Sequence, residues 1–150
     1  MATAKVLTED EITPSNLKKF FESIYIRADL TDHDALIVQA DDVLPVCITL
    51  DQQRKLLKLL FAYENDHGQR ALEYVNHMND TYSLARFTVS SSGKSIGVDY
   101  DLPYRGGINP YQLLSVLRIF TKVCIAALTE KESRIQEEAA PSGIPEGVLH

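Results

Sequence analysis

The stretch LARFTVSSSGKSIGVDYDL, residues 84–102, decides the fold class. Apolar and polar residues alternate in 84–90 and again in 95–102, which is the period of a β-strand with one covered and one open face. The linking residues 91–94 include Gly93, which can supply the positive φ that a tight connection needs. The stretch therefore predicts a β-hairpin and, with it, an antiparallel sheet.

Apolar residues at helical spacing lie on both sides of this hairpin. Upstream, the helix-start pair Thr13-Pro14 precedes a predicted helix over 14–23, and a second helix is predicted over 69–81. Downstream, Asn109-Pro110 begins the longest predicted helix. Its main apolar seam consists of Leu113, Leu117, Phe120, Cys124 and Ala127.

Further strands are predicted between the first two helices. Residues 35–39 and 44–50 are rich in β-branched residues, and Pro45 belongs at a strand start or on an edge. Residues 25–30 read as a strand or an extended entry. The leucines of 54–63 suit a helix and a third antiparallel strand equally well, so the residues alone leave this segment open.

The predicted order of elements is α-β-β-β-α-β-β-α. Because helices and strands do not alternate as βαβ units, we expect an α+β fold, an antiparallel sheet with helices packed on one face. Residues 13–137 form the single expected domain, 1–12 a flexible N-terminal arm, and 138–150, with two prolines and two glycines, a disordered C-terminal tail.

Composition limits the classes of function. The chain has 150 residues, of which 45% are hydrophobic and 24% charged, as in an ordinary globular protein. Its 15 basic residues are scattered among 21 acidic ones, for a net charge of −6, which argues against nucleic-acid and anionic-membrane binding. Cys47 and Cys124 lie in apolar runs and are interpreted as buried free thiols in preference to the alternative, a disulfide between them. With no signal peptide or 18-residue apolar stretch recognised, we expect a cytoplasmic protein.

A search for catalytic and metal-binding groups finds no convincing constellation. Gly93-Lys94-Ser95 lacks the earlier glycine of a phosphate-binding loop, and the serines at 90–92 have no adjacent base. The four histidines, at positions 33, 67, 77 and 150, are too scattered for a zinc site. Asp99 and Asp101 share one face of a strand and could hold a hard cation, but an exposed sheet face explains them better. No catalytic residue, metal or cofactor is therefore predicted.

Two asparagines on the second predicted helix, Asn76 and Asn79, are a further signal. Asn is a mediocre helix former because its side chain competes for backbone groups. Beside Val75 and Met78, the pair suggests polar contacts at a packed surface, either within the fold or between subunits. A helix end capped by Asn79 is an equally good interpretation.

Residues 75–79 on a helix, the hairpin, 99–107 with its Leu102-Pro103-x-x-Gly106-Gly107 pattern, and 109–113 together resemble the YbjN family of bacterial sensory transduction regulators. The resemblance extends weakly to 21–38 and 48–60, and covers about 14–128. It implies a fold similar to type III secretion chaperones, which favours a strand for 54–63. It also implies no catalytic residue and no cofactor, a homodimer, and regulation through a protein partner.

Two functional hypotheses follow. The first is a homodimeric, chaperone-like binding module that uses an apolar groove beside the first helix or on the sheet. Its candidate dimer or partner surface, carried over from the resemblance, consists of Leu72, Val75, Asn76, Met78 and Asn79. The alternative is a small-molecule-sensing domain whose polar pocket is formed by Asp99, Asp101, Tyr104 and Arg105.

Overall fold

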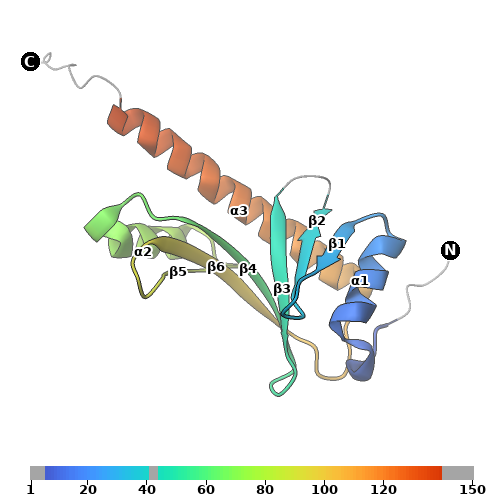
Figure 1. Ribbon diagram of the computed structural model, residues 1–150. Helices are drawn as coiled ribbons and strands as arrows, with labels where there is room; N and C mark the ends of the chain where they lie inside the picture. The colour runs from blue at the N-terminus through green and yellow to red at the C-terminus, as the bar shows by residue number, and fades with distance from the viewer. Residues whose placement is uncertain (1–5, 41–43, 140–150) are drawn as a thin grey trace, which may run out of the picture.

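The computed structural model describes residues 6–40 and 44–139, with 131–139 as backbone alone. Helices and strands follow the order α-β-β-β-β-α-β-β-α, with a 3-10 turn before α1 and another before α2 (Figure 1). Their bounds are α1 Pro14–Ser23, β1 Arg27–Leu30, β2 Leu36–Gln39, β3 Pro45–Asp51, β4 Leu56–Glu64, α2 Ala71–Thr81, β5 Arg86–Val89, β6 Ser95–Pro103 and α3 Pro110–Ala139.

The expected α+β fold with an antiparallel sheet is confirmed, and the sheet has one strand more than the predicted order. That strand is β1, within the segment that the sequence left as a strand or an extended entry. The ambiguous leucine-rich segment is a strand, β4, as the family resemblance implied. Periodicity could not decide this because Leu57 and Leu59 point into the core while Leu60 is half-buried on the other face.

All strand pairings in the six-stranded sheet are antiparallel, in the order β1-β2-β3-β4-β6-β5. The long central pair β4 and β6 is in register from Leu56 opposite Pro103 to Glu64 opposite Ser95. The predicted hairpin is β5 and β6, and Gly93 in its turn has φ 74°. In Figure 1, α2 and α3 lie behind the sheet and α1 lies beside β1. One sheet face is thus covered and the other is open.

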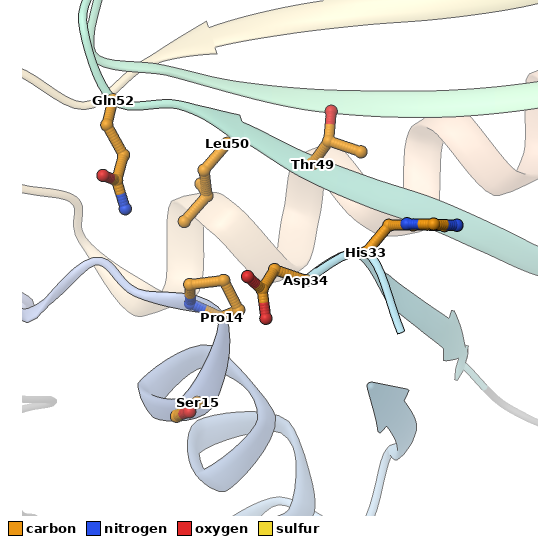
Figure 2. Close-up of a pocket in the computed structure, with 7 residues that line it drawn as sticks. All are labelled: Pro14, Ser15, His33, Asp34, Thr49, Leu50 and Gln52. Carbon is orange, nitrogen blue, oxygen red and sulfur yellow. The ribbon is translucent and has the colours of Figure 1, made fainter. Parts of the chain in front are cut away.

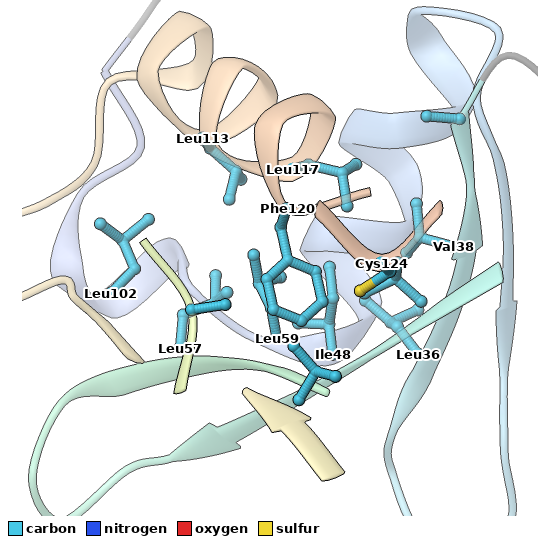
Figure 3. Packing of buried hydrophobic residues seen from close by; sticks show 14 of the residues in the cluster. Leu36, Val38, Ile48, Leu57, Leu59, Leu102, Leu113, Leu117, Phe120 and Cys124 are labelled. Atoms are coloured by element: carbon cyan, nitrogen blue, oxygen red, sulfur yellow. The ribbon is translucent and has the colours of Figure 1, made fainter. Parts of the chain in front are cut away.

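The core lies between the covered face and α3 (Figure 3). Alternate strand residues, among them Leu36, Val38, Ile48, Leu57 and Leu59, are 1% exposed or less. The five seam residues predicted on α3 are all 0% exposed, which confirms that seam. Burial of these side chains, at about 25 cal/mol per Å² of apolar surface, is the main force that holds α3 on the sheet.

Helix α3 is the one helix in the described part of the chain that is long and apolar enough to cross a membrane by length and composition. The window Pro110–Glu130 has a mean hydropathy of 1.5, whereas sequence inspection recognised no such stretch. The packing of its seam against the sheet accounts for part of this apolarity, since 39% of the window is buried.

Part of the expected N-terminal arm is attached to the domain. Leu7 and Ile108 exchange two backbone hydrogen bonds of 2.9 and 2.8 Å, and Ile12 is only 3% exposed. Residues 6–12 are therefore not a loose arm, since main-chain pairing and a buried side chain hold them. At the other end, 138–139 continue α3, and the rest of the expected tail lies outside the described residues.

Candidate binding surfaces

The open face of the sheet has an apolar centre between pairs of opposite charges. Strand alternation and register bring Ile37, Cys47 and Leu60 side by side across β2, β3 and β4. Around them the open face carries Asp29, Thr49, Lys58, Ala62, Arg86, Thr88, Gly97, Asp99 and Asp101. No helix covers this face in Figure 1. An open face with an apolar centre is a surface on which a second polypeptide can lie.

A hollow of about 330 Å³ lies in this face. It is lined mainly by apolar groups, with Cys47, Leu60 and Ala62 on one side and Thr88 and Asp99 on the other. It forms because Ala62 lies directly opposite Gly97, which leaves two adjacent strands almost without side chains there. A Cβ on Gly97 would lie 3.2 Å from the Thr88 hydroxyl. An apolar floor with a few polar groups at the rim suits one inserted side chain.

The two strand carboxylates are paired with cations. Asp99 lies 2.9 Å from the Arg86 guanidinium, and Asp101 lies 3.5 Å from the Lys58 ammonium. Within the described residues, no group of three or more His, Cys, Asp or Glu side chains is placed to hold a metal ion. Both carboxylates are therefore members of cross-strand ion pairs on the open face. Their place on one sheet face is the interpretation that the sequence favoured.

The predicted polar pocket of Asp99, Asp101, Tyr104 and Arg105 does not form as one site. Asp99 and Asp101 lie on the open face, whereas Tyr104 is 1% exposed and belongs to the core on the opposite side. Burial, followed by the negative charges of Glu9 and Asp51, raises the pKa of the Tyr104 phenol. Arg105 is exposed in the following loop. Asp99 and Asp101 share one face of β6, whereas Tyr104 and Arg105 follow the end of the strand at Pro103 and are placed by the loop.

The five residues of the candidate surface on α2 divide into two groups. Leu72 is 69% exposed and Asn76 is exposed beside it at i+4. Val75 and Met78 are 6% and 0% exposed and pack into the core, so they support the helix from below. The Asn79 amide bonds to the backbone of Phe87 in β5. Leu72 and Asn76 are therefore available to a partner, whereas Asn79, although also exposed, uses its amide for contacts within the fold.

A second hollow, polar and about 470 Å³, lies between the start of α1, the β1–β2 turn and the β3–β4 turn (Figure 2). Pro14 and Ser15 line it from α1, His33 and Asp34 from the first turn, and Thr49, Leu50 and Gln52 from the second. Ser15, His33 and Asp34 are exposed to solvent. The hollow is open and solvated and holds no buried reactive group.

Buried aromatic hydroxyls form a cluster that sequence inspection missed. The hydroxyls of Tyr63 on β4 and Tyr74 on α2 are hydrogen-bonded, and the His67 ring stacks on Tyr74 at 4.0 Å. Burial, then the bond to Tyr74, raises the pKa of Tyr63 far above its ordinary value. Nearby on α3, burial raises the pKa of the Cys124 thiol to about 12. Groups with a pKa raised in this way stay protonated at neutral pH. They therefore contribute to core packing and are poor nucleophiles.

The hollow over Gly97 was also missed, although the sequence carried a signal. A glycine inside an alternating strand indicates a weak or closely approached position. Its partner Ala62 became visible only with the pairing of β4 and β6, since 35 residues separate the two in sequence.

The family model described as "Putative bacterial sensory transduction regulator", YbjN, matches residues 13–130. This chain belongs to the YbjN family. The match covers most of the chain and includes the hairpin, α2 and the Gly106-Gly107 loop on which the resemblance depended. No curated protein matches the chain significantly.

Three solved structures share the fold of this YbjN family member. E. coli YbjN, described as "a putative transcription regulator", has a TM-score of 0.64 at 13% identity and covers 80% of this chain and 91% of its own. A chain of the HopA1–SchA chaperone–effector complex has a TM-score of 0.53 at 16% identity, covering 71% and 84%. The Yersinia pestis type III secretion chaperone SycH, in complex with a YscM2 fragment, gives 0.51 at 19%, covering 77% and 97%.

At these identities the similarity shows the fold, and the fold is type III secretion chaperone-like, as the resemblance implied. The descriptions of the family and of these neighbours are those of regulators and chaperones, and none is described as an enzyme. The fold of this chain is therefore similar both to that of E. coli YbjN and to that of secretion chaperones.

Proposed function

We propose that this YbjN family member is a non-enzymatic, cytoplasmic regulatory adaptor that acts by binding another protein, in the manner of a chaperone. The observation that carries the proposal is the open sheet face with its apolar centre and its hollow over Gly97. The proposal is supported by the fold, because two of the structural neighbours are solved in complexes with a protein partner.

The proposed partner segment lies across β3, β4 and β6 in an extended conformation. One of its aliphatic side chains fills the hollow between Leu60, Ala62 and Gly97. Beside the hollow, Arg86 is 65% exposed and has donors beyond the one directed at Asp99, so it can bind a carboxylate or carbonyl of the segment. Apolar insertion would supply affinity, and the arginine would fix the register.

We propose a homodimer with α2 as the contact. Leu72 is a large apolar side chain with no cover in the single chain, and Asn76 lies one turn further along the same helix face. Val75 and Met78 hold that face in place from the core side, and Asn79 ties the helix to β5. A symmetric contact of this kind would place Leu72 of one protomer against α2 of the other.

Substitution in the hollow tests partner binding. Ala62→Glu puts a charge into the hollow from an exposed position, and Gln112→Glu on α3 makes the same charge change outside it. In native cells, a tagged wild-type chain should retain a stoichiometric partner, which Ala62→Glu loses and Gln112→Glu keeps. An unchanged set of partners with Ala62→Glu would show that the hollow is not the binding surface.

Light scattering at micromolar protein tests the dimer. The wild-type mass should be twice 16.8 kDa, and Leu72→Asp should give the monomer mass. Ser91→Asp, an equal charge change at the exposed β5–β6 turn, should leave the dimer intact. A wild-type monomer would exclude the dimer while leaving the partner proposal to the first experiment.

A further inference from the structure

We propose that Tyr25 is an anchor residue, which inserts its ring into an apolar pocket on the protein partner. The inference rests on the proposed function, because it requires that the chain binds a protein other than itself. It adds a second contact to that function, on the α1–β1 connection and apart from both the hollow and α2.

Tyr25 occupies the position after α1 at which the chain turns left-handed. The Ile26 amide donates to the Phe21 carbonyl at 2.9 Å, and the Tyr25 amide donates to the Glu22 carbonyl at 3.1 Å. These two bonds form a Schellman motif, and φ of Tyr25 is 63°. Glycine is the usual residue there, because a side chain meets its own backbone at positive φ. A bulky aromatic residue at this position is strained.

The side chain of Tyr25 is not packed against the rest of the single chain. It is 98% exposed, the highest fraction of any large apolar side chain in the described residues. The helix end is satisfied by backbone bonds, and Phe21 and Ile26, 0% and 6% exposed, provide the apolar cover that accompanies such a motif. A residue that strains the backbone and buries nothing in the monomer fits a role in a contact with another molecule.

Among the described residues, two other non-glycine residues have positive φ, and both have simple explanations. Asp34 at 59° and Lys55 at 59° lie in the turns of β-hairpins and are polar. Asp tolerates the left-handed region, and Lys55 is half-buried in the tight β3–β4 turn. Tyr25 differs in being aromatic, apolar over its ring and fully projected. Lys55 is therefore a matched control with the same backbone strain.

The surroundings of Tyr25 indicate the chemistry of the partner. Two charged residues close to Tyr25 in the chain take part in ion pairs, Glu22 with Lys18 at 2.8 Å and Arg27 with Asp29 at 3.4 Å. A nucleic acid or an anionic membrane would call for unpaired cations beside the ring. One projecting phenol beside these paired charges, flanked by Ile24 at 37% exposure, fits an apolar protein pocket with an acceptor for the hydroxyl.

Stability measurements separate this role from a structural one. Tyr25→Gly relieves the strain, so its melting temperature should equal or exceed that of the wild type, by up to about 4 °C. Lys55→Gly should behave in the same way. A fall of several degrees for Tyr25→Gly alone would show that the ring stabilises the fold, and would overturn the proposal.

Photo-crosslinking in native cells tests the contact. p-Benzoylphenylalanine is placed at position 25, at position 62 in the hollow, and at position 111, where Tyr111 is a 62% exposed aromatic control. We expect one discrete adduct from position 25, formed with a different polypeptide and absent from position 111. No adduct, the same adducts as position 111, or an adduct of twice the chain mass would overturn the proposal.

The crosslinked polypeptide is then purified and its affinity for each variant is measured. Tyr25→Gly should weaken binding by about 30-fold or more, as for a hot-spot residue, and Lys55→Gly should leave it unchanged. Equal binding of Tyr25→Gly and wild type would overturn the anchor role. An adduct at position 62 without one at position 25 would overturn this inference and leave the proposed function intact. The absence of an adduct at both positions would overturn both.

Discussion

The side chain of Asn79 on α2 makes two hydrogen bonds to the backbone of one residue, Phe87 on β5. Its amide nitrogen donates to the Phe87 carbonyl at 3.0 Å, and its amide oxygen accepts from the Phe87 amide at 2.7 Å. Because β5 is an edge strand, these groups would otherwise face a free edge. Asn79 thus pairs with the backbone of Phe87 as a residue of a neighbouring strand would. This pairing blocks the β5 edge against hydrogen bonding with other chains.

Replacement of Asn79 should therefore be costly. Asn79→Ala removes both bonds to Phe87, and we expect a loss of about 1–3 kcal/mol in the free energy of unfolding, with aggregation through the opened edge. Asn76→Ala, on the exposed side of the same helix, should change the free energy by less than about 0.5 kcal/mol. Urea denaturation measures both, and equal effects of the two substitutions would contradict this account.

The two glycines of the family pattern, Gly106 and Gly107, are needed for different reasons. A Cβ on Gly107 would lie 2.7 Å from the Leu7 carbonyl oxygen, at φ 106°, whereas Gly106, at φ 83°, has open space around it. Gly107→Ala should therefore displace the N-terminal segment and destabilise the fold by about 2 kcal/mol or more, and Gly106→Ala only by its backbone strain of about 1 kcal/mol. Hydrogen exchange of the Leu7 amide should speed up in Gly107→Ala alone; protection in both variants would refute this.

The two sides of α3 should respond differently to truncation. Leu117 is 0% exposed against the sheet, so Leu117→Ala should cost about 2–5 kcal/mol. Ile119 is 45% exposed two residues away, and Ile119→Ala should cost less than about 1 kcal/mol. Chemical denaturation gives both values. Similar losses would mean that the outer side of α3 is also covered, by a partner copy or by a membrane.

Buried protonated groups predict a loss of stability at alkaline pH. Burial raises the pKa of Cys124 from 9.0 to about 12, so the folded state holds this proton more tightly than the unfolded chain does. The resulting stabilisation is complete below pH 9 and is lost between pH 9 and 12, at about 1.4 kcal/mol per pH unit. The raised pKa of Tyr63 acts in the same direction above pH 10.

Cys124→Ala should make this alkaline decline shallower, by about 1.4 kcal/mol per pH unit, in urea titrations at about pH 8, 10 and 11. Leu117→Ala is the control, since it removes core packing without removing a titrating group. It should lower the free energy of unfolding equally at every pH. An unchanged slope for Cys124→Ala would show that this thiol does not contribute to the decline.

Local chemistry made much of the fold predictable. Thr13 caps α1 by accepting from the Asn16 amide, Gly93 turns the hairpin, and the α3 seam is buried in full. Each of these depends on a few neighbouring residues, so short windows of sequence contain the information. The segment of β4 could not be decided in this way, because leucines on both faces of a strand hide its alternation.

The candidate surfaces were less predictable. Asp99 and Asp101 share one sheet face, as the alternation predicted, but they are half-buried there and their cations, Arg86 and Lys58, come from two other strands. Val75 and Met78 were grouped with Leu72 as one surface, and they proved to face the core. Spacing along a helix shows which residues share a side, and the sheet it packs on decides which side is covered.

Helices, hairpin and family could be recognised from the residues alone, because periodicity, caps and turn residues act over short distances along the chain. The hollow where Gly97 lies opposite Ala62, the bonds from Asn79 to the β5 edge and the exposure of Tyr25 became visible only in the folded chain. Each of these depends on which distant segments pack together, and burial of the whole core selects that arrangement.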